Sequence, residues 1–339
     1  MIELDGSQGE GGGQVLRTSL TLSMITGQPV RIVNIRANRS KPGLMRQHLV
    51  AVQAAAKVCG ADISDVQVGA QTLVFKPGRI RGGHYSFAIG TAGSSMLVLQ
   101  TLLPALLYAD GPSTVTVSGG THNPKAPPAE FLQRAYGRAM AEMGAQIDIR
   151  LERHGFYPAG GGIVSASVQP CAQWRHLELL APGARRAGYA ESFIAAVPYV
   201  VAQRELETVG TAMGWSGEQL RPRQLPDKQG PGNVLLITLD SEYVTEVFAA
   251  FGEKSVPAEA VAKQAVQDAR FYIASGAAVS EHLADQLMLP MALAGGGKFT
   301  VDRVSLHART NADVIAHFLP IDITFGTEGR HSVCTIAGR

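Results

Sequence analysis

One histidine has the surroundings expected of a nucleophile. His307 lies in the segment VSLHARTN, where the pattern predicts that a strand ends before a helix capped by Thr310 or Asn311. Strand ends in α/β proteins are places where reacting side chains are presented. A neutral imidazole is a competent nucleophile toward phosphorus near pH 7, and the phosphoramidate that it forms is labile enough to pass the group on. His307 is therefore a candidate for phosphoryl or nucleotidyl transfer.

Positive charge is concentrated in one stretch of the chain. Residues 11–61 contain no Asp or Glu, although the net charge of the whole chain is only +2. The cations of this stretch are Arg17, Arg31, Arg36, Arg39, Lys41, Arg46 and Lys57. Part of it, RANRSKPGLMRQH, is predicted to run from a strand end through a turn to a helix start, where N–H groups and arginines favour anions. The stretch predicts a phosphate-binding face, and the alternative is that these side chains merely cover helix surfaces with their stems.

Other motifs narrow the chemistry. The glycine loop GEGGGQ (residues 9–14) precedes a predicted helix and would let an anionic ligand approach the backbone, the alternative being an ordinary tight turn. No G-K-[S/T] follows it, which excludes a Walker A loop. The histidines show no H-x-H or H-E-x-x-H spacing, and the three cysteines form no C-x-x-C. The sequence therefore predicts neither a disulfide framework nor a structural zinc site, and it favours a reducing, cytoplasmic compartment.

The elements that would position these residues alternate between strand and helix. The predicted strands are 1–5, 30–35, 63–68, 72–76, 84–89, 114–118, 146–152, 162–168, 298–304, 321–326 and 331–336. The predicted helices are 11–26, 44–58, about 94–107, 129–143, 282–293 and 310–318. We interpret this order as three repeated β-α-β-α-β-β units of an α/β (α+β) fold, because internal repetition outweighs any single motif.

The third unit begins too late in the chain to follow the second directly. An insertion at residues 185–277 accounts for the delay, so we expect one domain of residues 1–184 plus 278–339 and a small inserted α+β domain. The insertion should contain a strand at 234–239 and a helix at 257–273, with Ser255 as its N-cap. The longest apolar run, 96–108, is too short for a membrane helix, and the acidic N-terminus predicts no signal peptide.

Six segments, taken in order, resemble the RNA 3'-terminal phosphate cyclase family. They are residues 9–17 (GEGGGQVLR), 36–48 (RANRSKPGLMRQH), 154–162 (HGFYPAGGG), 229–233 (QGPGN), 282–293 (HLADQLMLPMAL) and 305–311 (SLHARTN). The resemblance implies three repeats in a pseudo-threefold arrangement with a small inserted domain. It also implies a ligase that uses ATP and Mg²⁺ or Mn²⁺ to convert an RNA 3'-phosphate to a 2',3'-cyclic phosphate, through a histidine–AMP intermediate and an RNA-ppA end, releasing pyrophosphate and AMP.

The resemblance also implies roles for individual residues. His307 would be the nucleophile, and Glu10 would lie near the nucleotide or its metal. The residues expected at the ATP site are Glu10, Gln100, Pro127, Phe131, His282, Leu283, Ala284, Asp285 and Gln286. Those expected around phosphates and the RNA end are Arg17, Arg36, Arg39, Arg46 and Gln47. Bacterial members often have tyrosine at the position of His282, so adenine stacking here would rely on a smaller, titratable ring.

Two alternatives remain open at this point. Some cyclase-like proteins are non-catalytic factors in ribosome assembly, but the presence of Glu10, Asp285 and His307 argues against that role. The main substrate could instead be another phosphorylated end, such as a DNA terminus or an RNA 5'-phosphate. For the cyclase reading, the expected partner is RNA with a 3'-terminal phosphate, with no membrane and no obligate protein partner.

Overall fold

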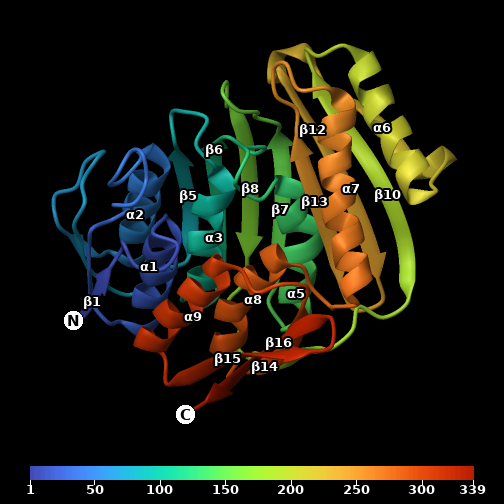
Figure 1. Cartoon of the computed structure of the whole chain (residues 1–339). Helices are drawn as coiled ribbons and strands as arrows, with labels where there is room; N and C mark the ends of the chain where they lie inside the picture. The colour runs from blue at the N-terminus through green and yellow to red at the C-terminus, as the bar shows by residue number, and fades with distance from the viewer.

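The computed structural model describes residues 1–339 and is a mixed α/β protein, as predicted. Its strands form four sheets of four strands each (Figure 1). No helix is long and apolar enough to cross a membrane. The elements fall into three successive units, coloured blue, green and red in Figure 1, with an insertion, drawn in yellow and orange, within the third.

The elements of the three units follow the predicted order. The first unit contains β1 (Ile2–Asp5), α1 (Gln14–Thr26), β2 (Val30–Val33), α2 (Arg46–Cys59), β3 (Asp62–Ile63) and β4 (Leu73–Lys76). The second contains β5 (Gly83–Ala88), α3 (Ser95–Leu106), β6 (Ser113–Gly119), α4 (Ala129–Phe131), the π-helix η1 (Leu132–Tyr136), α5 (Gly137–Glu142), β7 (Ile147–Arg153) and β8 (Gly162–Val168). The third contains β9 (Leu177–Leu179), α8 (Glu281–Leu293), β14 (Gly297–Val301), α9 (Leu306–Phe318), β15 (Ile321–Glu328) and β16 (His331–Gly338).

The sheets of the three units share one strand order. They run β1-β2-β4-β3, β5-β6-β8-β7 and β9-β14-β16-β15. In each sheet the first two strands are parallel and the other pairs are antiparallel. Parallel neighbours require a crossover, and α1, α3 and α8 provide it. The pseudo-threefold arrangement of the units stays a prediction.

The helices of different units pack on one another and so bring distant residues together. Helix α1 contacts α2, α3 and α9, and α9 also contacts α8. Their apolar faces form one large core with the sheets; Leu16, Leu20 and Leu22 of α1 are fully buried there. Because α1, α3, α8 and α9 come from three different units, their packing brings side chains from distant parts of the chain to one place.

The insertion has a sheet of its own, in the order β11-β10-β12-β13. Its elements are β10 (Arg185–Ala195), α6 (Tyr199–Met213), the 3-10 turn η2 (Gly217–Gln219), β11 (Leu220–Gln224), the 3-10 turn η3 (Asp227–Gln229), β12 (Gly232–Ser241), β13 (Thr245–Phe251) and α7 (Ala258–Ser275). Helices α6 and α7 cover one face, where a second cluster of buried apolar side chains lies. The other face contributes Phe193, Leu236 and Val247 to the main core. We therefore propose residues 185–277 as an inserted domain that shares one face with the rest of the protein.

Ion pairs reinforce this shared face. Arg134 of η1 contacts Glu191 of β10 at 2.6 Å, and Arg138 of α5 contacts Asp240 of β12 at 2.6 Å. The predicted helix 129–143 therefore makes the ion-pair contacts with the insertion. Its middle turn is π-helical rather than α-helical.

Two helices are capped by residues other than the predicted ones. Helix α9 begins at Leu306 and not near residue 310, because the Ser305 side chain accepts a hydrogen bond from the N–H of Ala308 and caps the helix four residues earlier. Helix α7 begins at Ala258 with Pro257 at its N-cap. Ser255 has φ +70°, whereas an N-cap residue is extended, so Ser255 is not the cap that the sequence suggested.

A buried carboxyl group joins the insertion to the third unit and makes stability depend on pH. Both oxygens of Glu246 accept hydrogen bonds from Ser280, the residue before α8, and burial raises the pKa of Glu246 to about 8. Because the pKa is raised in the folded state, protonated Glu246 contributes fully to stability below about pH 4.5, its ordinary pKa. This contribution is lost as pH rises through about 8. We expect Glu246→Gln to raise the melting temperature at pH 8 and to leave it unchanged at pH 5. Thermal melts at the two pH values check this, and an equal effect at both would contradict it.

Candidate functional site

A cleft of about 1650 Å³ lies between the three units and the insertion. The first unit contributes the glycine loop 9–14 and the starts of α1 and α2, and the second contributes α3 and the segment 123–128. The third unit contributes α8 and the first turn of α9, and the insertion contributes β13 and the start of α7. Every part of the fold is therefore needed to complete this cavity.

Most of the residues singled out from the sequence line this cleft. They are Glu10, Arg17, Arg36, Arg39, Arg46, Gln47, Gln100, Pro127, Phe131, His282, Asp285, Gln286 and His307. The two exceptions are Leu283 and Ala284, which point into the main core from α8 and do not reach the cleft. The side chains of these two residues therefore serve packing, and the contact of this segment with ATP stays a prediction.

His307 lies in the first turn of α9, not at the end of a strand as predicted. Its side chain is half exposed to the cleft, and its Nε2 lies 3.7 Å from Glu10 Oε1. Partial burial lowers the pKa of His307 below its ordinary value, and the positive charges of Arg17 and Arg39 lower it further. The imidazole is thus held in its neutral form, which is the form that attacks phosphorus.

The glycine loop fixes Glu10 beside His307. The backbone N–H of Glu10 donates to Thr310 Oγ1 of α9 at 2.9 Å. Gly9 has φ +60°, and a Cβ there would collide with the Thr310 side chain, so only glycine allows this contact. Glu10 Oε1 pairs with Arg39, while Oε2 is buried without a hydrogen-bond partner. A carboxylate oxygen left unpaired in a cleft fits a hard divalent cation such as Mg²⁺.

A buried network connects α1 with α8 and α9 behind the nucleophile. Asn311 Oδ1 accepts from the Thr18 hydroxyl at 2.7 Å, and its Nδ2 donates to the Asp285 carbonyl at 2.8 Å. Burial raises the pKa of the Asp285 carboxyl to about 6 and lowers the pKa of Arg17 to about 10. Arg17 donates to Gln14 Oε1 at 2.7 Å and is itself one of the residues that line the cleft.

The arginines of the basic segment have different tasks. Arg36 has φ +55° and donates to the carbonyls of Lys41 and Gly43, so it holds its own loop in place. Arg46 is the first residue of α2 and takes part in no ion pair of the chain, which leaves its charge for a ligand. Gln47 Oε1 accepts from the backbone N–H of Ser94 at 2.8 Å and ties the first unit to the second.

The remaining wall of the cleft is less polar. Gln100 of α3 donates to Gln286 of α8, and Pro127 and Phe131 lie in the same lining. The insertion adds Val247, Ala249, Phe251 and Val256, together with Gln264 of α7. Sequence reasoning missed these insertion residues, because β13 carries no motif and was not predicted as a strand.

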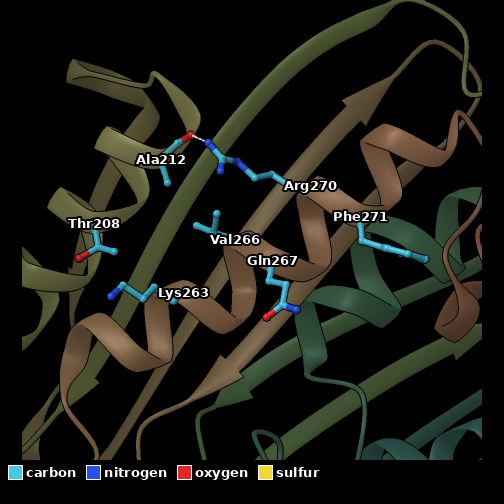
Figure 2. A pocket seen from close by; sticks show the side chains of 7 residues that line it. All are labelled: Thr208, Ala212, Lys263, Val266, Gln267, Arg270 and Phe271. Carbon is cyan, nitrogen blue, oxygen red and sulfur yellow. Dashed lines mark hydrogen bonds between the residues drawn. The ribbon is translucent and has the colours of Figure 1, made fainter.

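A second, smaller pocket of about 480 Å³ lies between α6 and α7 (Figure 2). It is lined by Thr208, Ala212, Lys263, Val266, Gln267, Arg270 and Phe271. Arg270 donates to the Ala212 carbonyl across it, which joins the two helices. None of the sequence-predicted site residues lies there, so the chemistry belongs to the larger cleft.

The arrangement suits the transfer of a nucleotidyl group between phosphates. A neutral imidazole, an acidic side chain for a cation, and four arginines line one water-accessible cavity. Catalysis of such transfers consists mainly of positioning and charge neutralisation. The cavity is also large enough for two phosphorylated molecules to lie together, since pockets for one small ligand usually measure about 300–1000 Å³.

Comparisons with known proteins point to one family. The model of the family described as RNA 3'-terminal phosphate cyclase matches residues 8–325. A protein named RNA 3'-terminal phosphate cyclase from Ralstonia nicotianae (strain ATCC BAA-1114 / GMI1000) is 56% identical over 336 residues. That alignment covers 99% of this chain and 96% of the relative.

Proposed function

Because the chain belongs to the RNA 3'-terminal phosphate cyclase family, we propose that it converts an RNA 3'-phosphate to a 2',3'-cyclic phosphodiester at the expense of ATP. It is an enzyme of the ligase class. The observation that carries the finer proposal is the position of His307, whose Nε2 faces Glu10 in a cleft lined by Arg17, Arg39 and Arg46.

The reaction proceeds in three balanced steps. In the first, a ring nitrogen of His307 attacks the α-phosphorus of ATP, a P–N bond forms, and pyrophosphate leaves. In the second, an oxygen of the RNA 3'-phosphate attacks the same phosphorus, the P–N bond breaks, and the RNA carries an RNA-ppA end. In the third, the 2'-hydroxyl attacks the RNA phosphorus, loses its proton, and AMP leaves. The third step is intramolecular, and proximity of this kind supplies on the order of 7–11 kcal/mol.

We assign the residues that line the cleft to the two substrates. Gln100, Pro127 and Phe131, with His282 and Gln286 of α8, form the wall for the nucleotide. Arg39, Arg46 and Gln47, with the loop that Arg36 holds in place, would surround the RNA terminal phosphate, and Arg17 would serve the phosphates near His307. Glu10 Oε2 would hold Mg²⁺ or Mn²⁺, which neutralises charge on the ATP phosphates when it is bound.

A direct assay tests the proposal. The protein is incubated with ATP, Mg²⁺ and an RNA oligonucleotide that carries a labelled 3'-phosphate. We expect the label to become resistant to phosphatase, because a cyclic diester has no terminal phosphate. RNA with a terminal 2'-deoxyribose is the control; it should accumulate the activated end and never cyclise. ATP binding without any AMP transfer would instead support a non-catalytic RNA-binding factor.

The same assay, together with a measurement of AMP transfer to the enzyme, distinguishes residues that bind the RNA end from residues that bind ATP. Arg46→Ala removes a cation that has no ion-pair partner, and a charged hydrogen bond is worth about 1.5–3 kcal/mol. We expect cyclisation to fall on the order of 10- to 100-fold while AMP transfer to the enzyme changes less than about threefold. Lys57→Ala, in the last turn of α2 and away from the cleft, is the matched control. Equal losses in both steps would place Arg46 at the ATP phosphates instead.

A further inference from the structure

A second cluster of chemically capable side chains lies outside the cleft. His122 follows β6, Glu130 lies in α4, and His154 directly follows β7. Each offers one donor atom, and the three donor atoms lie within 4.8 Å of one another. The side chains of His122 and Glu130 are 0% and 4% exposed, and that of His154 is 16% exposed. None of the three lines the cleft, so the proposed reaction gives this cluster no task.

The hydrogen bonds within the cluster do not satisfy all of its polar atoms. Glu130 Oε2 lies 2.8 Å from His122 Nε2, and Glu130 Oε1 lies 3.9 Å from His154 Nε2. The second distance is too long for a hydrogen bond, and His154 Nε2 is buried without any partner. A buried ring nitrogen without a partner is costly unless something else satisfies it.

The neighbouring Thr121 contacts the ring nitrogen of His122 that faces away from the carboxylate. The Thr121 hydroxyl accepts from the N–H of Gly155 at 2.9 Å and is directed at the carbonyl of the same residue. His122 Nδ1 lies 2.9 Å from that hydroxyl oxygen, so the protein already holds this ring nitrogen. In the tautomer in which Nδ1 donates to Thr121, the lone pair of Nε2 faces Glu130 Oε2, and a metal ion can be held between these two atoms. A ligand histidine held through its other nitrogen in this way is the usual second shell of a metal site.

We propose that His122, Glu130 and His154 bind one divalent transition-metal ion of the Zn²⁺ type. Two imidazoles and one carboxylate suit zinc, which holds such ligands at about 2.0–2.2 Å. The three donor atoms already lie within 4.8 Å of one another. Imidazole nitrogens favour this metal over Mg²⁺, which prefers oxygen ligands. The site is thus chemically distinct from Glu10 in the cleft.

The ion would fix one wall of the cleft. The segment from His122 to Glu130 carries Pro127 and leads to Phe131, both of which line the cleft. On the other side of the cluster, the backbone N–H of His154 donates to the side-chain oxygen of Gln229, in the insertion, at 3.1 Å. A metal at this point ties the nucleotide wall, the end of β7 and the insertion together. Phe156 and Phe193, both part of the main core, lie against the histidine rings.

Metal analysis of the purified protein tests the proposal. The full chain is produced without a histidine tag in medium containing ZnSO₄ and purified without chelator, and its zinc content is measured by mass spectrometry. We expect about one zinc per chain. Glu130→Gln and His154→Asn should each reduce the content at least tenfold. Glu10→Gln in the cleft and His317→Asn on the surface of α9 should retain it.

Folding is checked separately so that a damaged variant cannot imitate the result. Circular dichroism identifies the variants that keep the native fold, and His154→Asn, the less buried position, is the variant on which the conclusion rests. Replacement by Co²⁺ should give visible absorption bands typical of low-coordinate cobalt in the wild type and not in His154→Asn. Folded wild-type protein that contains less than about a tenth of an equivalent and binds no added Zn²⁺ overturns the proposal. The cluster is then a buried imidazolium–carboxylate pair.

Discussion

His307→Ala is expected to abolish the transfer of AMP to the protein. The proposed P–N bond forms at the ring of His307, and no other histidine pairs with Glu10. Loss of a nucleophile costs on the order of 10³-fold or more in rate. The measurement is an intact-mass spectrum after incubation with ATP and Mg²⁺ without RNA: the wild type should gain the mass of AMP and the variant should not.

The control for this variant lies on the same helix. His317→Ala removes an exposed histidine whose Nδ1 contacts the Asp313 carbonyl, and it should leave the adduct unchanged. In the wild type, addition of RNA with a 3'-phosphate should discharge the adduct, whereas RNA with a 3'-hydroxyl should not. An AMP adduct on His307→Ala would remove this residue from the role of nucleophile. Equal melting temperatures for the variants show that the fold is intact.

Arg17→Gln is expected to slow AMP transfer and to change its dependence on pH. Arg17 is buried next to Asp285, and each lost contact with phosphate should cost about 10- to 100-fold. Its positive charge also contributes to the low pKa of His307, after the larger effect of burial. AMP transfer requires neutral His307, so the rate falls when pH drops below that pKa. Without Arg17 the pKa rises, and the acidic fall of the rate should begin at higher pH.

The rate of adduct formation between pH 5 and pH 8 checks both parts of this prediction. Arg31→Gln is the matched control, because Arg31 is an exposed arginine of β2 paired with Glu3 at 3.3 Å. This control should keep both the rate and the pH profile. A slower Arg17→Gln enzyme with an unshifted profile would show that Arg17 binds phosphate without tuning His307.

Much of the fold was predictable from local patterns. The strand and helix order of the first two units follows from apolar periodicity and from glycines such as Gly27 and Gly60, which end α1 and α2 in the left-handed conformation. Strand β9 escaped prediction because it has only three residues and gains its partner β14 from beyond the insertion. Such pairing leaves no local signal in the sequence.

Sequence motifs predicted part of the site. Residues that only packing brings together could not be predicted in this way. The sequence predicts Thr310 or Asn311 as a helix cap, because both residue types favour caps, but these two side chains bond to Glu10, Thr18 and the backbone of Asp285 instead. Ser305 takes the cap and moves His307 into the helix. The cluster of His122, Glu130 and His154 joins three separate elements, so no spacing rule could reveal it.

The pairing of β9 with β14 also bears on the order in which the chain is made. During synthesis β9 emerges before its partner, and the sheet of the insertion is complete by Phe251, before β14 exists. Domains generally fold as units while the chain grows. The insertion can thus fold on the ribosome while the edge of β9 is still unpaired. Of the predicted site residues, His307 is synthesised last. If His307 is the nucleophile, as proposed, the nascent chain cannot form the AMP adduct before α9 has emerged.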